Sequence, residues 1–422
     1  MNPASVLVVG QGYVGLPLAM RAVACGFNVT GFDLDSSRVK RLAAGESFIE
    51  DIDAATLEAA HASGRYRVSD HPSAIGGFDI AVITVPTPLR ESLPDLSFIE
   101  ASVTALAPEL RPGATVILES TTYPGTTRDL VVPLLEEGSG LEAGIDFYVG
   151  YSPERIDPGN RVWTFTTTPK IVSGINPASL ERVQAFYSKI VDTVVPVRGC
   201  EEAELTKLLE NTFRHVNVAL VNELAVFAHE LGVDLWESID AASTKPFGFM
   251  RFTPGPGVGG HCLPIDPSYL SWRVRQSLGK SFRFVELAND VNDHMPDYVV
   301  QRVTEMLNRA RKSVNGANIV LLGLAYKKNS GDARESPAVT VARQLERLGA
   351  DLVAVDPYLR EQPRALGFTP HHELTDEMLD RADLVVILTD HDDFDYENVA
   401  RRAKCVFDTR HRLADAPNVE SL

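Results

Sequence analysis

The chain has 422 residues, of which 44% are hydrophobic and 23% charged, and its formal net charge is −17. This length predicts two or three domains, and the composition is ordinary for a globular protein. The negative charge argues against nucleic acid and anionic membrane partners, although an anionic small ligand remains compatible with local Arg, Lys and backbone amides. We expect neither a membrane span nor a signal peptide, because no apolar run is long enough and no basic segment precedes the first one. Four scattered cysteines do not suggest a disulfide framework, so we expect a cytoplasmic protein.

The amino-terminal region has the pattern of a strand, a tight turn and a helix. A strand at 5–9 is followed by the glycine-rich stretch 10–15, a helix at 16–24 and a second strand at 28–33. Further short apolar runs occur at 79–85, 115–118 and 147–149, with segments of helical length between them. This alternation predicts an α/β domain with a doubly wound parallel sheet of the Rossmann type.

The stretch GQGYVG, residues 10 to 15, predicts a dinucleotide site because it follows a strand and opens a helix. Its glycines permit a tight turn and a close approach of a pyrophosphate to the helix amino terminus. Asp33 ends the next strand, where a carboxylate accepts hydrogen bonds from ribose hydroxyls and repels a 2′-phosphate, which favours NAD over NADP. A turn used only for packing is the alternative. Arg38 either covers the adenine or phosphates or is solvated surface. The cofactor-binding residues predicted here are Gly10, Gly12, Tyr13, Val14, Gly15, Asp33 and Arg38.

Three polar clusters follow apolar strands of this first region: Pro86-Thr87-Pro88, Ser120-Thr121-Thr122 and 152–155. Any single cluster would be only a turn. Because the carboxyl ends of parallel strands meet at one edge of a sheet, three clusters together predict a ligand site there. Glu154 is the residue among them with an obvious acid–base role.

From about 201 to 300 the pattern becomes helical, with apolar residues at helical spacing and no proline in the segment 201–231. Lys207, Asn211 and Arg214 share one face of this helix, and Asn217 continues the row. A solvated face is the usual interpretation. However, apolar residues surround the row and leave little surface for water, so we expect it to face a cleft, where Lys207 and Asn211 stabilise an oxyanion. These apolar residues are Leu205, Leu208, Leu209, Phe213, Val216, Val218, Ala219 and Leu220.

The stretch PGPGVGGHCLPIDPSY, residues 254 to 269, is too rich in Gly and Pro for a helix or a central strand. It is therefore a shaped loop, and it carries Cys262 and, four residues later, Asp266. Either Cys262 is packed, or the loop presents a nucleophile whose thiol pKa a nearby Lys207 would lower. A thiolate beside an oxidisable carbon and NAD can capture an aldehyde as a thiohemiacetal. The pattern indicates no metal site.

The pattern of the first region returns after about residue 315. The segment 26–33 resembles 349–356, and 79–84 resembles 383–389, in the same order. The repeat predicts a second α/β unit, with chance similarity of buried strands as the alternative.

These motifs resemble the UDP-glucose/GDP-mannose dehydrogenase family of nucleotide-sugar 6-dehydrogenases over almost the whole chain. The resemblance rests on GQGYVGLPLA, VPTP with PDLS, ESTTYPGTT, SPER, ELTKLLENTFRHVNVALVNELA, GGHCLPIDP and GLAYKKNSGDARESPA. It implies an NAD-binding Rossmann domain at 1–198, a helical middle domain at 199–312 that carries the catalytic loop and a homodimer interface, and a second Rossmann-like domain at 313–422 for the nucleotide sugar.

The resemblance also implies a reaction, the four-electron oxidation of a hexose C6 hydroxymethyl to a uronate with two NAD, as in polysaccharide biosynthesis. Cys262 adds to the aldehyde formed by the first oxidation, and the second oxidation leaves a thioester that water hydrolyses. The implied catalytic residues are Cys262 as nucleophile, Lys207 and Asn211 for the oxyanion, Asp266 for proton removal with a water, Thr121 for positioning a water, and Glu154 as base in hydrolysis.

The same resemblance supplies binding residues. Arg334 matches an arginine that reaches a cofactor phosphate, and Arg251 matches one that reaches into the neighbouring subunit's site. The remaining implied cofactor residues are Pro86, Thr87 and Thr121. The implied substrate residues are Glu154, Arg155, Lys207, Asn211, Arg214, Asn217, Arg251, Gly259, Tyr326 and Lys327.

Pro158 bears on the substrate, because the UDP-glucose branch usually has a second glutamate at this position. Together with SPERIDPGN, NTFRHVN and PGPGVGGHC, Pro158 favours UDP-N-acetylglucosamine or an epimer, while UDP-glucose and dTDP-glucose remain alternatives. Two other classes are compatible with the glycine fingerprint: a two-electron hydroxy-acid dehydrogenase and a non-catalytic NAD-binding protein. The first class would also have a Lys–Asn helix, but it would not need Cys262 or a second nucleotide domain. The second class would have no reason to place Lys207, Asn211, Cys262 and Asp266 at the family's spacing.

Overall fold

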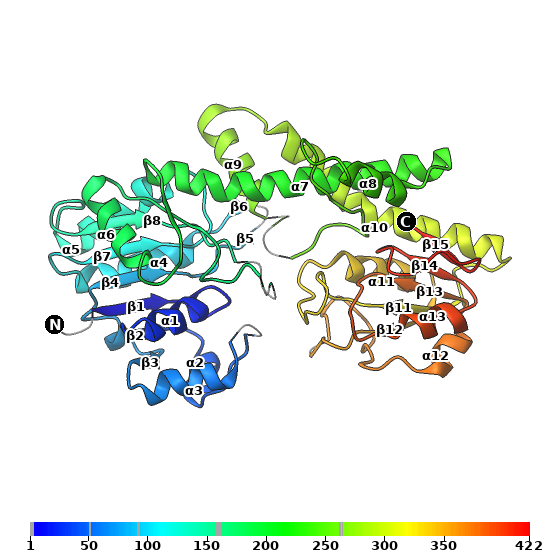
Figure 1. The fold of residues 1–422 in the computed structure, drawn as a ribbon, viewed down its shortest axis with the longest axis horizontal. Coiled ribbons are helices and arrows are strands. Elements are labelled where there is room, and N and C mark those ends of the chain that lie inside the picture. The colour runs from blue at the N-terminus through cyan, green and yellow to red at the C-terminus, as the bar shows by residue number, and fades with distance from the viewer. Residues whose placement is uncertain are drawn as a thin grey trace. The chain divides into compact units, whose positions relative to one another are not determined.

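The structure is a computed structural model that describes residues 4–49, 52–90, 93–156, 160, 162–260, 263, 265–360 and 362–422. The chain divides into two compact units (Figure 1). Unit 1 comprises residues 1–210 and 272–279, and unit 2 comprises residues 211–271 and 280–422. Two helices, α7 (Cys200–Leu231) and α9 (Asp266–Leu278), each contribute residues to both units.

Unit 1 is built on a six-stranded sheet in the order β3-β2-β1-β4-β7-β8, and every pair in it is parallel. Its strands are β1 (Ser5–Val9), β2 (Asn28–Phe32), β3 (Tyr66–Ser69), β4 (Ile80–Ile83), β7 (Thr115–Leu118) and β8 (Tyr148–Tyr151). Two small pairs accompany it, β5 (Leu89–Arg90) with β6 (Leu93–Pro94) and β9 (Lys170–Val172) with β10 (Val194–Pro196). The strands predicted at 79–85, 115–118 and 147–149 correspond to β4, β7 and β8.

The helices of unit 1 alternate with these strands, as the sequence pattern predicted. They are α1 (Gly15–Ala24), α2 (Ser36–Ala43), α3 (Ala54–Ala62), α4 (Ser97–Leu106), α5 (Val132–Ser139) and α6 (Pro177–Tyr187), with short turns η1 (Pro72–Ala74), η2 (Ala107–Glu109) and η3 (Thr127–Val131). Side chains of α1, α3 and α6 form one buried cluster with Val6 and Val8 of β1, Val82 of β4 and Ile117 of β7. Because side chains alternate along a strand, this cluster lies on one face of the sheet.

Unit 2 contains a second parallel sheet, in the order β12-β11-β13-β14-β15. Its strands are β11 (Asn318–Leu322), β12 (Asp351–Val355), β13 (Leu384–Ile387), β14 (Val406–Asp408) and β15 (Val419–Ser421). Its helices, besides its parts of α7 and α9, are α8 (Leu235–Ser243), α10 (Arg283–Arg309), α11 (Pro337–Arg347), α12 (Asp376–Arg381) and α13 (Tyr396–Arg402). Residues of α10 and α11 pack with Ile319 and Leu321, whereas residues of α12 and α13 pack with Val320 and Leu322. The second sheet is therefore covered by helices on both faces.

The internal repeat seen in the sequence is a repeat of structure. Gly10 and Gly323 follow the central strands β1 and β11 at φ +94° and +80°, and a Cβ on either would lie within 3 Å of a threonine carbonyl oxygen, 2.9 Å for Thr84 and 2.4 Å for Thr389. Each threonine hydroxyl donates a hydrogen bond to the neighbouring glycine-rich turn, at Gly10 and at Ala325. The prediction of a second α/β unit is confirmed.

Among the described residues, no helix combines the length and the apolar character needed to cross a bilayer.

Candidate functional site

The three glycines of the first turn have different environments. A Cβ on Gly15 would lie 1.9 Å from the carbonyl oxygen of Gly10, and one on Gly10 would approach Thr84, so these two positions require glycine for packing. A Cβ on Gly12 would meet nothing within 4 Å. Packing thus explains two of the glycines, and Gly12 leaves open space beside the turn.

The amino terminus of α1 fits an anionic group next to that space. Its N-cap residue, Val14, makes no side-chain capping hydrogen bond, and the first turn contains no acidic residue. The first N–H groups of a helix have no partner within the helix, and the helix dipole favours negative charge there. Tyr13 is 45% exposed beside this turn. The residues at 10–15 therefore fit the pyrophosphate of a dinucleotide.

Asp33 is buried directly behind the turn. Its Oδ2 accepts a hydrogen bond from the backbone N–H of Gln11 at 2.7 Å and pairs with the Arg38 guanidinium at 2.8 Å. Arg38 also lies over the ring of Phe48, 5.3 Å from its centroid. Asp33 and Phe48 thus fix Arg38 at the edge of the predicted adenosine site.

Unit 2 repeats this arrangement with Asp356 at the end of β12. Asp356 Oδ2 accepts backbone N–H groups of Leu324 at 2.7 Å and Ala325 at 3.0 Å, and it contacts His391 Nε2 at 3.1 Å. Burial would raise the pKa of Asp356, but the hydrogen bonds from His391 and from the two N–H groups hold it below its usual value. The second turn is therefore fixed by an ionised carboxylate, although its sequence lacks the full glycine fingerprint.

Glu204 of α7 holds the segment that follows Thr121 through three hydrogen bonds. The Glu204 carboxylate accepts the N–H groups of Gly125 at 2.6 Å and Thr127 at 2.8 Å, and the Thr127 hydroxyl at 2.7 Å. Burial raises the pKa of Glu204 to about 7, although the hydrogen bonds from Thr127 and Gly125 act in the opposite direction. Thr121 itself is half-buried, and Ser120 donates a hydrogen bond to the carbonyl of Val85 at 2.7 Å.

The cluster Pro86-Thr87-Pro88, which follows β4, lies next to the cluster that follows β7. The hydrogen bond from Ser120 to the carbonyl of Val85 joins the two clusters. Pro86 is exposed and Thr87 is half-buried. The clusters after β4 and β7 are thus joined by a hydrogen bond, as expected of neighbouring strands whose carboxyl ends share one edge.

Glu154 is 9% exposed and lies among charged groups of unit 1. Its main-chain carbonyl accepts a hydrogen bond from Lys207 Nζ at 2.6 Å, and its carboxylate accepts the N–H groups of Arg155 and Ile156. Lys170 Nζ lies 3.5 Å from Glu154 Oε2. The structure therefore brings together two predicted catalytic residues, Glu154 and Lys207.

Sequence reasoning missed Lys170 and Glu119, which form a buried ion pair at 2.8 Å next to Glu154. Glu119 immediately precedes the Ser120-Thr121-Thr122 cluster, and this position at the end of a buried strand was the available signal. Arg155, predicted to bind substrate, uses its guanidinium to contact Glu210 at 2.7 Å and the carbonyl of Pro169 at 2.6 Å.

The reason given for the burial of the Lys207 row is wrong, although Lys207 and Asn211 are 9% and 4% exposed. The flanking apolar side chains do not exclude water, since Leu209 is 61% and Phe213 45% exposed. They lie on a different face of the helix from the polar row. Lys207 is buried because it reaches the carbonyl of Glu154.

In unit 2, Asn211 and Asp266 are in direct contact. The Asn211 amide donates a hydrogen bond to Asp266 Oδ2, and both residues are 4% exposed. Asp266 is the first residue of α9, where the helix dipole favours a carboxylate. Of the other two residues of the row, Arg214 is exposed, and Asn217 donates to the carbonyl of Phe213 on its own helix.

The glycine-rich loop is fixed by close packing against the segment after β11. A Cβ on Gly259 would lie 2.7 Å from Tyr326 Cβ, and one on Gly260 would lie 2.7 Å from the Tyr326 ring. The N–H of Gly260 also donates to the carbonyl of Arg334 at 3.3 Å. Gly259, Tyr326 and Arg334, predicted separately from the motifs, are therefore neighbours, whereas Cys262 and Pro158 lie outside the described residues.

A buried polar chain, which the sequence did not reveal, anchors the start of this loop. Asn222 of α7 accepts the N–H of Gly255 at 2.9 Å and donates to Asn292 of α10 at 2.9 Å. His215 contacts Asn292 at 3.4 Å and Asn289 at 2.7 Å, and burial holds the pKa of His215 below its usual value. These residues fasten the loop to two long helices.

The remaining predicted residues lie at the surface of unit 2 or near it. Lys327 is half-buried, Arg334 is exposed and pairs with Asp332, and Arg251 is exposed and pairs with Asp240. Among the described residues, no group of three or more His, Cys, Asp and Glu side chains could hold a metal ion.

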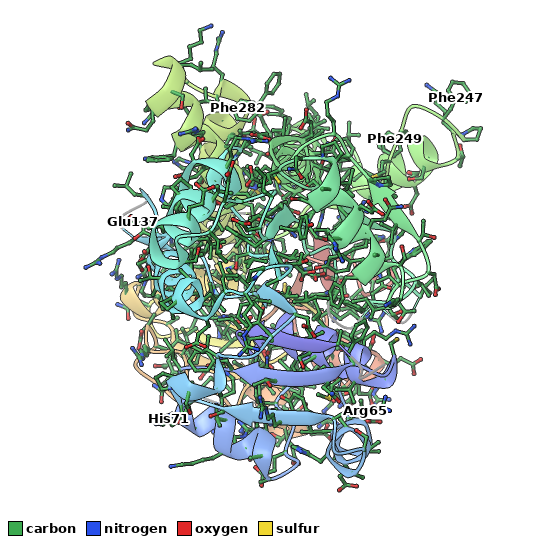
Figure 2. All side chains as sticks on the ribbon, turned by 90° about the vertical axis from the view of Figure 1, so that its left-hand side faces the viewer. Arg65, His71, Glu137, Phe247, Phe249 and Phe282 are labelled. Carbon is green, nitrogen blue, oxygen red and sulfur yellow. The ribbon has the colours of Figure 1, made fainter. Side chains whose placement is uncertain are left out.

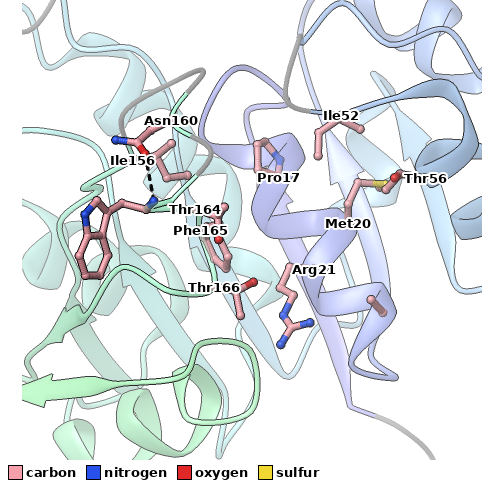
Figure 3. Close-up of a pocket in the computed structure, with 12 residues that line it drawn as sticks. Pro17, Met20, Arg21, Ile52, Thr56, Ile156, Asn160, Thr164, Phe165 and Thr166 are labelled. Carbon is pink, nitrogen blue, oxygen red and sulfur yellow. Dashed lines mark hydrogen bonds between the residues drawn. The ribbon is translucent and has the colours of Figure 1, made fainter.

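A pocket of about 490 Å³ lies in unit 1 beside α1 (Figure 3). Its walls are α1, Ile52 and Thr56, together with Ile156, Asn160 and residues 163–166. Arg21 faces the pocket, and its Nε donates a hydrogen bond to the carbonyl of Ile190 at 2.8 Å. None of the lining residues is a predicted site residue, so the pocket does not bear on the assignments above.

Comparison with known families accounts for nearly the whole chain. Residues 4–191 match the NAD binding domain of the UDP-glucose/GDP-mannose dehydrogenase family, residues 201–294 its central domain, and residues 320–415 its UDP binding domain. The chain belongs to this family. The resemblance inferred from the motifs is thereby confirmed, as are the fold class and the use of NAD.

Two relatives match this chain over nearly their whole length. The chain is 34% identical over 419 residues to a UDP-N-acetyl-D-mannosamine dehydrogenase of Pyrococcus horikoshii, covering 98% of this chain and 96% of the relative. It is also 34% identical to a UDP-N-acetyl-D-glucosamine 6-dehydrogenase of Pseudomonas aeruginosa, covering 98% of each. The solved structure of a UDP-D-ManNAc dehydrogenase from Pyrococcus horikoshii superposes with a TM-score of 0.90 at 33% identity, covering 99% of this chain and 98% of that one. The protein is thus an NAD-dependent nucleotide-sugar dehydrogenase whose last domain matches the UDP binding domain of the family.

Proposed function

We propose that the protein oxidises the C6 hydroxymethyl of a UDP-N-acetylhexosamine, the glucosamine form or an epimer, to the uronate, with two NAD consumed per sugar. The contact that carries this proposal is the buried hydrogen bond between Asn211 and Asp266. It joins the amide predicted to stabilise an oxyanion to the carboxylate predicted to assist proton removal. A two-electron dehydrogenase or a non-catalytic NAD-binding protein gives no reason for this pair beside the cysteine loop.

The proposed roles of the chain's residues follow from their positions. Asp266 draws the proton from the C6 hydroxyl through a water, and Asn211 and Lys207 donate hydrogen bonds to the oxygen as negative charge develops on it. Cys262 provides the thiolate that adds to the aldehyde. Thr121 orients the hydrolytic water, and Glu154 accepts its proton. NAD, when bound, accepts a hydride from C6 in each oxidation.

The proposed binding residues divide between the two halves of the chain. The turn at 10–15 with Asp33 and Arg38 binds the dinucleotide, together with Pro86 and Thr87. The nucleotide sugar contacts Arg155, Arg214, Asn217, Gly259, Tyr326 and Lys327, and Arg334 reaches a cofactor phosphate.

The choice of an N-acetylated sugar is supported by the names of relatives and by Pro158. The two relatives described above are named for UDP-N-acetylhexosamines. UDP-glucose is the second candidate, because the structure of a UDP-glucose dehydrogenase from Pyrobaculum islandicum superposes with a TM-score of 0.85 at 30% identity, covering 96% of this chain and 94% of that one. dTDP-glucose is the third.

A homodimer is proposed because unit 2 exposes an apolar helix face. Leu220, Leu224, Phe227 and Leu231 recur at helical spacing on α7 and are 53%, 41%, 50% and 77% exposed. A row of this kind is typical of a helix that packs against a partner. Phe247 and Phe249, which project from the loop after α8 (Figure 2), are 70% and 42% exposed and precede Arg251. This loop is a candidate for the contact in which Arg251 reaches a neighbouring subunit. For the location of the protein in the cell, we still expect the cytoplasm.

A panel of nucleotide sugars tests the proposed reaction and substrate together. UDP-N-acetylglucosamine, UDP-N-acetylmannosamine, UDP-N-acetylgalactosamine, UDP-glucose and dTDP-glucose are each supplied in limiting amount with excess NAD, and NADH is measured per sugar. We expect two NADH per sugar and the highest kcat/KM for an N-acetylated sugar. One NADH per sugar would contradict the reaction, and a preference for UDP-glucose or dTDP-glucose would contradict only the substrate.

A further inference from the structure

Glu154 is connected to a buried charge network that the proposed roles do not use. Glu119, directly after β7, and Lys170, at the start of β9, are 1% and 4% exposed. Their ion pair measures 2.8 Å, and the Tyr187 hydroxyl at the end of α6 donates a hydrogen bond to the same Glu119 oxygen. Lys170 Nζ is 3.5 Å from Glu154 Oε2, so one ammonium is shared by two carboxylates.

Burial of these charged groups costs free energy unless they form ion pairs and hydrogen bonds with each other. Burial would lower the pKa of Lys170, but Glu119 and Glu154 hold it above its usual value, so the ammonium stays charged. Burial raises the pKa of the Tyr187 hydroxyl, which therefore remains a hydrogen-bond donor. The second oxygen of Glu119 has no hydrogen-bond partner in the described part of the chain. A pair with such an incomplete set of partners adds little to stability compared with an apolar replacement.

Charged groups lie on two sides of Glu154. On the α7 side, Lys207 Nζ binds the main-chain carbonyl of Glu154, and the Arg155 guanidinium is neutralised by Glu210. On the other side, the Lys170 ammonium is shared by Glu154 and Glu119, and burial raises the pKa of Glu119 although the ammonium acts in the opposite direction.

We propose that Lys170 is a positioning residue for Glu154 in thioester hydrolysis, and that Glu119 and Tyr187 hold Lys170 in place. The inference rests on the proposed function, in which Glu154 is the base. In that step the water oxygen bonds to the acyl carbon, the carbon–sulfur bond breaks, the Cys262 thiolate leaves, and the water proton goes to Glu154. Lys170 directs Oε2 of Glu154 and provides a positive charge beside it, while Glu119 offsets part of that charge.

The two charges give predictions of opposite sign. An opposite charge within about 4–6 Å of a carboxylate favours its ionised form, and a like charge disfavours it. Lys170→Met should therefore move the acid limb of thioester hydrolysis to higher pH by about 1–3 units. Glu119→Gln should move this limb to lower pH and slow hydrolysis at neutral pH, because the ammonium then acts on Glu154 alone. Lys170→Arg should restore the wild-type limb in large part.

The test follows the acyl adduct in rapid-quench single turnovers of the full-length protein between pH 5 and 9, with intact-mass detection. Lys312→Met is the matched control, since it removes an ammonium from an ion pair with Asp383 in unit 2 and should leave the limb unchanged. The double variant Lys170→Met/Glu119→Gln removes both charges of the buried Lys170–Glu119 pair and keeps the test open if a single variant does not fold. Its limb should lie above that of Glu119→Gln.

The outcomes separate the two hypotheses. No acyl adduct in the wild type would contradict the proposed function. An adduct that hydrolyses with a limb unmoved by Lys170→Met, or moved in the same direction by both single variants, would leave the function standing and overturn the role of Lys170.

Discussion

Glu204→Gln is expected to change how the stability of unit 1 depends on pH. Glu204 is buried, accepts hydrogen bonds from Gly125 and Thr127, and has its pKa raised from 4.5 to about 7. A folded-state pKa above the unfolded value means that the folded state binds more protons between these two values. The contribution of Glu204 is therefore fully present below pH 4.5 and is lost as the pH rises through 7.

The size of this effect follows from the pKa values. One pKa unit corresponds to about 1.4 kcal/mol, so the shift from 4.5 to about 7 corresponds to about 3 kcal/mol of unfolding free energy. Glutamine does not titrate and lacks this contribution. The difference in unfolding free energy, wild type minus Glu204→Gln, should thus fall by about 3 kcal/mol between pH 4 and pH 8.

Urea unfolding at a series of pH values measures this difference, with tryptophan fluorescence as the signal. Trp272 is a suitable reporter because its ring packs on Tyr123, 5.1 Å between centroids, in the segment that Glu204 holds. Glu201→Gln is the control: Glu201 is on the same helix but pairs with Arg128 near the surface, and its pKa is lowered rather than raised. A difference between wild type and Glu204→Gln that is constant with pH would refute the reasoning.

Three further outcomes are expected. The wild type should prefer NAD strongly over NADP, because a 2′-phosphate would approach the Asp33 carboxylate; equal kcat/KM values would show that Asp33 does not face the ribose. Asn222→Leu should lower the unfolding free energy by about 1–3 kcal/mol and reduce kcat with NAD affinity unchanged, because it leaves the Gly255 N–H without its partner; unchanged kcat would show that this anchor does not position the loop. Phe227→Glu should produce a monomer in sedimentation velocity, whereas a dimer of unchanged stability would show that this face of α7 is not the interface.

Much of the fold was predictable because local signals and tertiary structure agree. Glycine turns after buried strands predicted both α/β units. The similar segments 26–33 and 349–356 contain the equivalent strands β2 and β12. The position of Asp33 beside the glycine turn was predictable, because βαβ geometry places the residue after the second strand at a fixed distance from the turn.

The supporting residues of the site were not predictable, for a physical reason. Lys170 and Glu119 are separated by 51 positions, and Asn222 and Asn292 by 70, and each pair meets only through the packing of separate elements. Nothing in the local sequence of Glu204 distinguishes it from the exposed acids on the same helix. The exposed face at Leu209 and Phe213 was misread because helical periodicity shows which residues share a face and not whether that face meets its own chain or a partner.

The central claim, a four-electron oxidation through a thioester on Cys262, is tested most directly by comparing the wild type with Cys262→Ser in the presence of limiting UDP-N-acetylhexosamine. Intact-protein and peptide mass spectrometry during turnover should show a transient acyl adduct on the wild-type peptide that contains Cys262, together with two NADH per sugar. Cys262→Ser should bind NAD and remain folded but should form no uronate at a steady rate, because serine is a much poorer nucleophile at neutral pH. Uronate formation by Cys262→Ser at near wild-type rate, with two NADH per sugar, would contradict the covalent mechanism.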